Sequence, residues 1–255
     1  MAKSRPQIDT PQLLLLRAVA DNQIGPALPQ ALALAHCQSS KLIKMDLDDI
    51  PGEDTILRQA INHEEAYILG ENAKVVLEWE RLFSVEEKLN HETSQLTRIE
   101  SHKFQRALYR LMILSWSYGA NAYPPYSIDD VARGTELPRS LKRQKRYLQT
   151  LQTPELRELV TVAVFLCRIG ERVLEMAGGT NGTDDVYHWE SQPLFIGPAL
   201  LLRCYQQSGA GYMKSIWLDD DSLADEFIMK PAQQVLADRS LAREALYQPS
   251  LLVGS

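Results

Sequence analysis

Histidines next to acidic residues are the first candidates for chemistry in this chain. His63-Glu64-Glu65 and His91-Glu92 are similar to the start of the helix that holds zinc in many proteases. That site also needs a second histidine four residues after the first, so that both imidazoles reach one ion. Tyr67 and Gln95 stand at those positions. We therefore expect solvent-facing or capping histidines here, and no bound metal.

A thiol beside an imidazole is the second candidate, because such a pair can act as a nucleophile and its base. His36-Cys37 has both groups, but neighbours on a helix point about 100° apart and do not face each other. The better interpretation of Cys37 is a buried small thiol. Cys167 and Cys204 are far from it and from each other, so neither a disulfide framework nor a CxxC metal pair is available. A reducing compartment fits this usage best.

Two polar stretches could hold an ion. The glycine-rich run from Gly178 to Asp185 could wrap an anion with its amides, but it follows a predicted helix and has no Gly-Lys-Ser/Thr. The acidic residues Asp219-Asp220-Asp221, Asp225 and Glu226 could coordinate a hard cation, but the glycine that an EF-hand loop needs is missing. We expect a helix stop with a turn in the first case and a solvated acidic face in the second.

The sharpest charge feature is a basic cluster between residues 139 and 146. Five cations fall within these eight residues, namely Arg139, Lys142, Arg143, Lys145 and Arg146. Such clusters serve as nuclear-localisation signals and contact RNA, DNA or acidic protein surfaces. The alternative is a charged helix face paired with nearby carboxylates, and we favour it because the cluster sits inside the domain.

Composition limits the class of protein. A chain of 255 residues with 45% hydrophobic residues can bury a substantial core as one compact domain. The net charge of -6 argues against a general nucleic-acid binder. The apolar run Leu13 to Leu16 is too short to cross a membrane. We expect a soluble protein that is cytoplasmic, nuclear or both.

Helical signals recur along the chain and strand signals do not. Apolar spacing predicts helices over residues 13–20, 27–35, 55–83, 94–118, 153–177, 194–205 and 231–247. Within the fourth, Ser101 to Leu114 reads as the spine of a buried helix, with Arg98, Lys103, Arg106 and Arg110 on the remaining side.

Four local signals refine these helices. Ser84-Val85-Glu86-Glu87 has the spacing of a capping box and predicts a new helix start. Thr153-Pro154-Glu155 predicts the start of the most apolar helix, which we expect to be central. Prolines and tyrosines between Asn121 and Pro138 exclude regular helix there. Gly70 is the weak point of the long third helix.

Two segments carry a family resemblance. Ile24-Gly25-Pro26-Ala27-Leu28-Pro29-Gln30-Ala31-Leu32-Ala33-Leu34-Ala35 and Phe104-Gln105-Arg106-Ala107-Leu108-Tyr109-Arg110 are similar to the helical region that follows the F-box in many filamentous-fungal F-box proteins. The resemblance covers about residues 20 to 120. It implies a region that recognises a substrate protein, after an F-box that binds the Skp1 adaptor of a ubiquitin ligase.

The chain departs from that pattern at its start. An F-box takes roughly forty residues that open with Leu-Pro and an acidic residue. Only Met1 to Asn22 precede the matching region, and Leu28-Pro29 lies within it. Three explanations stay open: a lost F-box, a shortened gene model, or a protein that never engaged Skp1. Binding to Skp1 is therefore doubtful.

Together these patterns predict an all-α, irregular multi-helix bundle in a single compact domain, with a less regular C-terminal third. The expected parts are a helical segment over residues 1–22, for which a remnant is one interpretation, a helical core over 23–177, and a helical and loop extension over 178–255 that packs on the core.

The function predicted from the sequence is a non-enzymatic protein–protein interaction domain of F-box-associated type, acting in substrate recognition or as a scaffold. We expect a protein partner, and no catalytic residues, cofactor, metal, membrane or nucleic-acid partner. Two alternatives stay open. One is an enzyme whose site is assembled from distant segments, and the other is a nuclear nucleic-acid-associated protein that uses the cluster 139–146.

Overall fold

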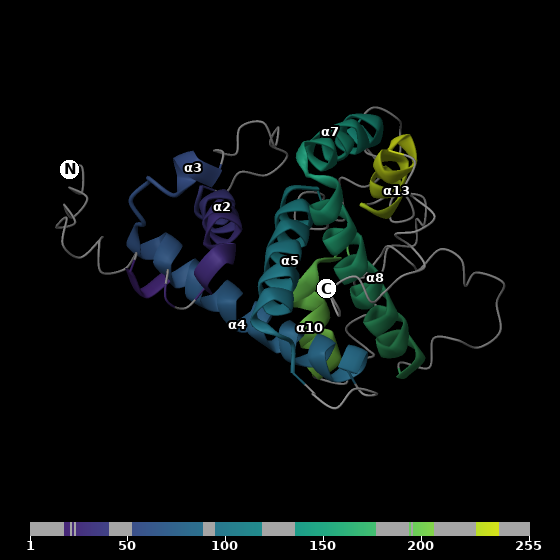
Figure 1. Cartoon of the computed structure of the whole chain (residues 1–255), viewed down its shortest axis with the longest axis horizontal. Coiled ribbons are helices and arrows are strands. Elements are labelled where there is room, and N and C mark those ends of the chain that lie inside the picture. Colours follow the sequence, from purple (N-terminus) through teal and green to yellow (C-terminus); the bar gives the residue numbers. More distant parts are fainter. Residues whose placement is uncertain are drawn as a thin grey trace, which may run out of the picture.

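The computed structural model describes residues 18–20, 22, 24–40, 53–88, 95–118, 136–176, 194, 196–206 and 228–239. Regular structure in these ranges is helical throughout, without a strand. In chain order the elements are η1 (Gly25–Ala27), α2 (Leu28–Ser39), α3 (Glu53–Ile56), α4 (His63–Lys88), α5 (Arg98–Tyr118), α7 (Glu136–Thr150), α8 (Thr153–Met176), α10 (Pro198–Gln206) and α13 (Met229–Asp238). The predicted all-α fold with several helices is confirmed (Figure 1).

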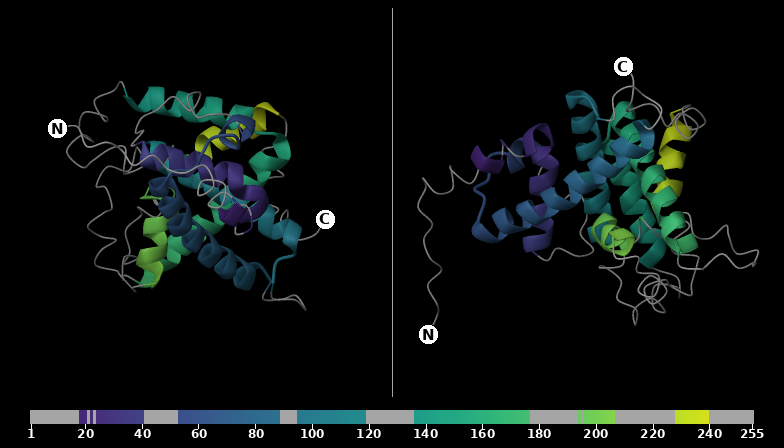
Figure 2. Two further views of the ribbon diagram at one scale, coloured as in Figure 1. Left: turned by 90° about the vertical axis from the view of Figure 1, so that its left-hand side faces the viewer. Right: turned by 90° about the horizontal axis from the view of Figure 1, so that it is seen from below.

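Helix α5 lies in the middle of the described structure. It packs against η1, α2, α4, α8 and α10, and the ribbon views place α2 on one side of it and α8 on the other (Figures 1 and 2). Every residue from Ala107 to Ser115 is buried. The prediction of a buried helix over 101–114 is confirmed for Phe104 and residues 107–114, whereas residues 101–103, 105 and 106 are half-buried. Helix α8, which we expected to be central, instead flanks α5 and packs on α10 and α13.

Four aromatic side chains join three of these helices. Phe83 of α4 lies 4.8 Å, between ring centroids, from Phe104 of α5, and meets Phe165 of α8 edge-on at 5.0 Å. Trp79 also meets Phe165 edge-on, and its Nε1 donates a hydrogen bond of 3.0 Å to the carbonyl of Pro198, where α10 begins. Such ring pairs stabilise by about 1 kcal/mol beyond the area they bury. This cluster therefore fixes α4, α8 and α10 around α5.

The predicted helix start at Ser84 is wrong. Helix α4 continues through Ser84, which is buried together with Leu82 and Phe83 just before it, whereas Val85 after it is 43% exposed. Helix α4 instead starts just after Asn62, whose Oδ1 accepts a hydrogen bond from the Glu65 amide at 2.9 Å. The Asn62 amide donates to the Glu65 carboxylate at 3.0 Å. This reciprocal pair is a capping box.

Other boundaries differ from the predictions by less. Helix α3 ends at Ile56, so residues 55–83 do not form one helix. The buried stripe of α4 includes Leu69 and Val76, one position after the predicted Ile68 and Val75. Helix α7 includes Pro138, which we had assigned to the irregular segment; the first turn of a helix tolerates proline because its amide needs no partner there.

Helix α8 begins at Thr153 as predicted, and α10 and α13 overlap the last two predicted helices, with α10 ending one residue later and α13 beginning two residues earlier than predicted. The predictions for residues 10–17, Gly178 to Asp185, Asp219 to Glu226 and 240–247 lie outside the described residues. The division into residues 1–22, 23–177 and 178–255 stays a prediction.

A pair of glycine substitutions tests this packing. Gly70→Ala should raise the free energy of unfolding by about 1 kcal/mol, because glycine disfavours a helix interior and a Cβ at Gly70 would meet no atom within 4 Å. Gly197→Ala is the contrasting control: its φ is +87°, and its Cβ would lie 3.2 Å from Ser115 Cβ, so it should lower that free energy. Urea unfolding followed by circular dichroism measures both. A lower stability for Gly70→Ala would contradict the packing of α4.

Candidate functional site

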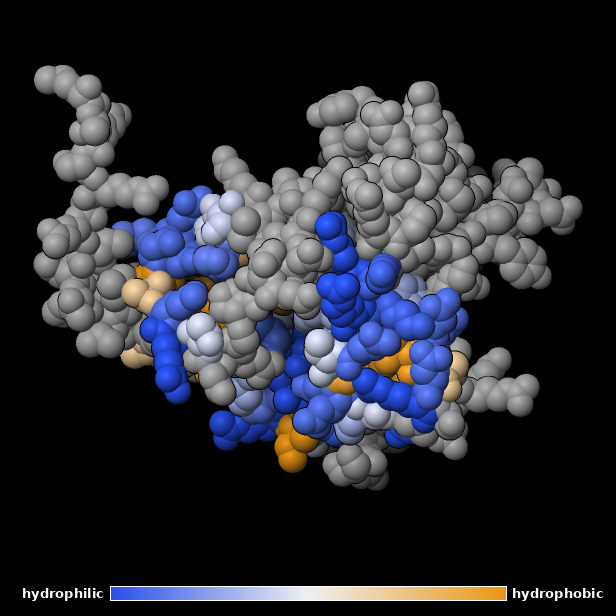
Figure 3. All heavy atoms as spheres, turned by 90° about the horizontal axis from the view of Figure 1, so that it is seen from above, coloured by the Kyte–Doolittle hydropathy of each residue, from blue (hydrophilic) through white to orange (hydrophobic). Residues whose placement is uncertain are grey.

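The basic cluster lies on α7, and the opposite side of this helix is fixed to the protein. Leu148 is fully buried, and Gln144 is buried beside the start of α13. The Gln144 Oε1 accepts a hydrogen bond of 3.1 Å from the amide of Ile228. On the side of the molecule where α7 lies, the described surface is mostly hydrophilic (Figure 3). The basic side chains can therefore face outward while the helix stays anchored.

We call Lys142, Arg143, Lys145 and Arg146 the α7 basic face. Lys142 and Arg146 are exposed and one turn apart, whereas Arg143 and Lys145 are half-buried. Lys145 forms an ion pair of 3.3 Å with Asp238 of α13, the kind of pairing that the favoured interpretation of the cluster requires. Arg143 and Arg146 have further polar or charged contacts. The side chain of Arg139 lies outside the part of the chain that the structure describes, and the role of the cluster stays a prediction.

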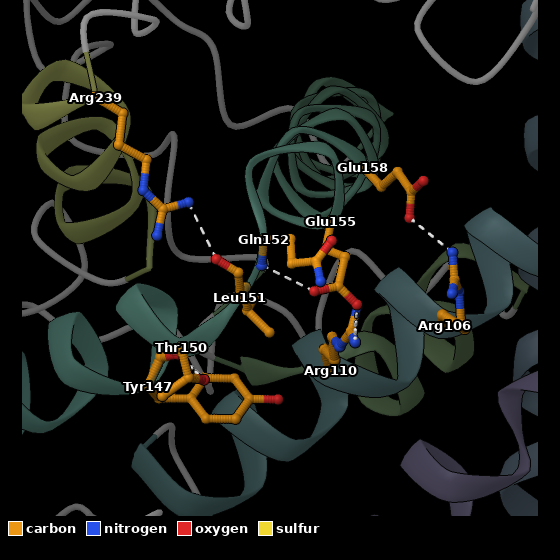
Figure 4. A network of polar contacts seen from close by, with 9 residues as sticks. All are labelled: Arg106, Arg110, Tyr147, Thr150, Leu151, Gln152, Glu155, Glu158 and Arg239. Carbon is orange, nitrogen blue, oxygen red and sulfur yellow. Dashed lines mark hydrogen bonds and ion pairs between the residues drawn. The ribbon is translucent and has the colours of Figure 1, made fainter. Parts of the chain in front are cut away.

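Arg239 closes the corner where α7, α8 and α13 meet. Its guanidinium donates hydrogen bonds of 3.0 Å to the carbonyls of Gln149 and Leu151, at the end of α7. It also donates to the hydroxyl of Thr153 at 3.3 Å. Carbonyls at a helix end lack hydrogen-bond donors within the helix. The Arg239 side chain supplies these donors. The end of α7 is thereby tied to α13 and to the start of α8 (Figure 4).

A second charged group lies between α5 and α8, and the sequence did not predict it. Arg110 pairs with Glu155 at 2.5 Å, and Arg106 pairs with Glu158 at 3.4 Å (Figure 4). We had placed both arginines on the non-core side of α5, yet the Arg110 side chain is only 4% exposed. The available signal was two arginines four residues apart and two glutamates three residues apart, which places each pair on one helix face.

The two carboxylates have opposite pKa shifts. Burial alone would raise the pKa of Glu155, but a hydrogen bond of 2.9 Å from the Gln152 amide, together with Arg110 and Arg106, lowers it. Burial raises the pKa of Glu158, and the attraction of Arg106 only partly offsets this effect.

Split pKa values of this kind are typical of acid–base pairs in enzymes. In this group, however, the closest charged partner of each carboxylate is an arginine. Glu155 also accepts the Gln152 amide at the start of α8. These contacts account for the group as one that holds α5 and α8 together.

The described histidine and cysteine candidates are exposed, join two helices or lie buried in the core. His63 is exposed, as expected, and His91 lies outside the described residues. The His36 Nδ1 lies 3.2 Å from the Glu65 carboxylate and joins α2 to α4. Cys37 is fully buried, and burial raises the pKa of its thiol to about 12, so the predicted buried thiol is confirmed. No three His, Cys, Asp or Glu side chains in the described ranges are grouped so as to hold a metal.

Neither a family model nor a curated protein nor a solved structure matches this chain. None of the described helices has the length and apolar character needed to cross a membrane.

The carboxylate pair provides a matched test. Glu155→Gln should lower the free energy of unfolding at neutral pH by about 3 kcal/mol, because it leaves the buried Arg110 charge without its counter-ion. Glu158→Gln should change this free energy by less than about 1 kcal/mol. Burial of the ionised Glu158 carboxylate costs free energy, and Arg106 is partly hydrated, so removing the pair removes a cost together with a gain. Denaturant unfolding of both variants at several pH values measures these effects.

The pH dependence should separate the two residues. The pKa of Glu155 is lower in the folded state, so its stabilisation is complete above the ordinary value of 4.5 and is lost as pH falls through the lower value. The pKa of Glu158 is raised, so stability is gained as pH falls through that raised value toward 4.5. Each Gln variant should abolish its own component, and equal pH profiles for the two variants would contradict the assignment.

Proposed function

We propose that this chain is a non-enzymatic protein–protein interaction domain of F-box-associated type, which recognises a substrate protein or acts as a scaffold. The observation that carries the proposal is the α7 basic face. It places exposed cations on a chain of net charge -6. The other side of the same helix is fixed by Gln144 and Leu148, so the cations project from a firmly held support.

An acidic protein surface is the partner that this face suits best. Exposed Lys142 has no ion-pair partner in the described ranges, and the Lys145–Asp238 pair is open to water on both sides. Exposed pairs of this kind stabilise a fold by about 1 kcal/mol or less, so an incoming carboxylate can replace them. Nucleic acid is disfavoured as a partner because the acidic remainder of the chain repels a polyanion.

The resemblance to F-box-associated regions supports the same class of function. Its two segments correspond to η1 with α2 and to part of α5, and these elements pack directly on one another. Segments far apart in sequence thus belong to one packed unit. Skp1 is not proposed as a partner.

Charge reversal tests the proposal. Lys142→Glu/Arg146→Glu should abolish capture of partner proteins from fungal extract, because it replaces attraction of carboxylates by repulsion. Lys74→Glu/Arg81→Glu on α4 is the matched control, with the same change in charge at two exposed sites. Quantitative mass spectrometry of nuclease-treated eluates measures retention. Identical protein sets for wild type and both variants would contradict a role of the α7 basic face.

The same eluates distinguish the alternatives. Retention that disappears on nuclease treatment would favour a nucleic-acid-associated protein. A small molecule that co-purifies with the chain in native mass spectrometry would favour an enzyme. Recovery of Skp1 would show that the chain engages the adaptor directly.

A further inference from the structure

A second group of cations lies on the first three turns of α5, where Arg98 is exposed and His102, Lys103 and Arg106 are half-buried. Arg98, His102 and Arg106 follow one another at four-residue spacing, and Lys103 lies beside this row. Ile99 precedes Lys103 by one turn and is 61% exposed, although large apolar side chains gain from burial. We call these five residues the α5 cationic face. Residues four apart on a helix are neighbours, so the five side chains form one continuous surface.

The arrangement opposes helix stability. Positive side chains near a helix N-terminus are repelled by the helix dipole, and like charges four residues apart repel each other. The pKa of His102 is lowered, first by burial and then by the charges of Arg98 and Arg106, while Glu80 attracts its proton more weakly. These repulsions lower the stability of the start of α5.

The carboxylates that surround the α5 cationic face have other partners. Glu100 is buried and accepts the Thr97 amide at 2.7 Å, which caps α5. Glu80 accepts the Gln105 amide group at 2.6 Å. Glu158 pairs with Arg106 and attracts Lys103 only from a distance.

Three cationic side chains are left over. In the part of the chain that the structure describes, no hydrogen bond or ion pair engages the side chains of Arg98, His102 or Lys103. Among the described residues, these three side chains are therefore left to interact with a carboxylate that the described structure does not supply.

We propose that the α5 cationic face is a docking site for an acidic peptide segment of another protein, in which carboxylates alternate with apolar side chains. The carboxylates would pair with Arg98 and Lys103, and an apolar side chain would cover Ile99. Charge complementarity identifies the acidic part of this partner. Ile99 favours a peptide over a nucleic acid, because a phosphate backbone offers nothing apolar to cover it.

This proposal rests on the function proposed above only in that both concern protein partners. The two faces lie on different helices, and charge reversal of each separates them. The α7 basic face can bind a partner whether or not α5 does, and the reverse also holds.

The test is a titration with a fluorescently labelled synthetic peptide of alternating glutamate and leucine. Arg98→Glu/Lys103→Glu should weaken binding about tenfold or more, because two attractive contacts become repulsive. Lys74→Glu/Arg81→Glu on α4, with the same change in charge at two exposed sites outside both basic faces, should leave binding within about twofold. Ile99→Ser should weaken it about threefold through lost apolar contact. A glutamate–serine peptide, which keeps the charge, should bind wild type more weakly.

A second measurement reports on the site itself. Carboxylates bound beside His102 favour its protonated form, so the peptide should raise the imidazole pKa measured by NMR. Circular dichroism of each variant checks that the helices are retained. The proposal is overturned if wild type does not bind the peptide or if the His102 pKa does not move. It is also overturned if Lys142→Glu/Arg146→Glu loses binding while Arg98→Glu/Lys103→Glu keeps it. Equal affinity for duplex DNA would also overturn it in favour of a general anion surface.

Discussion

The burial of α5 on all sides over residues 107–115 is the constraint from which the other positions follow. A helix without a solvent face must find partners for every polar group it carries into the core. Arg110 has Glu155 at the start of α8, and the Ser115 hydroxyl donates to the carbonyl of Leu194 at 2.7 Å. The apolar side chains gather the helices around α5, and the polar ones determine how α8 and the segment before α10 are placed against it.

Two helix starts couple local structure to packing through one carboxylate. Glu65 accepts the Asn62 amide at the start of α4 and also contacts His36 of α2. Glu155 accepts the Gln152 amide at the start of α8 and also pairs with Arg110 of α5. A free helix start leaves its first amides without partners, and a buried arginine needs a counter-charge. Because one side chain meets both needs, each helix begins where its neighbour can use the same carboxylate.

The sequence predicted features that depend on local pattern and missed those that depend on distant partners. Apolar spacing was sufficient for the all-α class, for the buried stretch of α5 and for the start of α8 at Thr153. Ser84 was misleading because the residues of a capping box permit a helix start but do not require one, and Ser84 is instead buried with Leu82 and Phe83 inside α4. Arg110 was assigned to the non-core side because its partner lies 45 residues away. No local pattern contains such a pairing.

The two basic faces differ in how firmly their helices are held. Helix α5 is surrounded by η1 and four helices, so the α5 cationic face needs little ordering before a partner binds. Helix α7 is held mainly by α13, through Gln144 and Lys145. Charges farther apart than about 8 Å are screened at physiological ionic strength, so the acidic remainder of the chain hardly weakens a contact once it has formed. At lower ionic strength, where screening is weaker, its net charge of -6 also repels polyanions as they approach. If both proposals hold, an acidic chain with small basic faces disfavours nucleic acid and attracts short acidic segments locally.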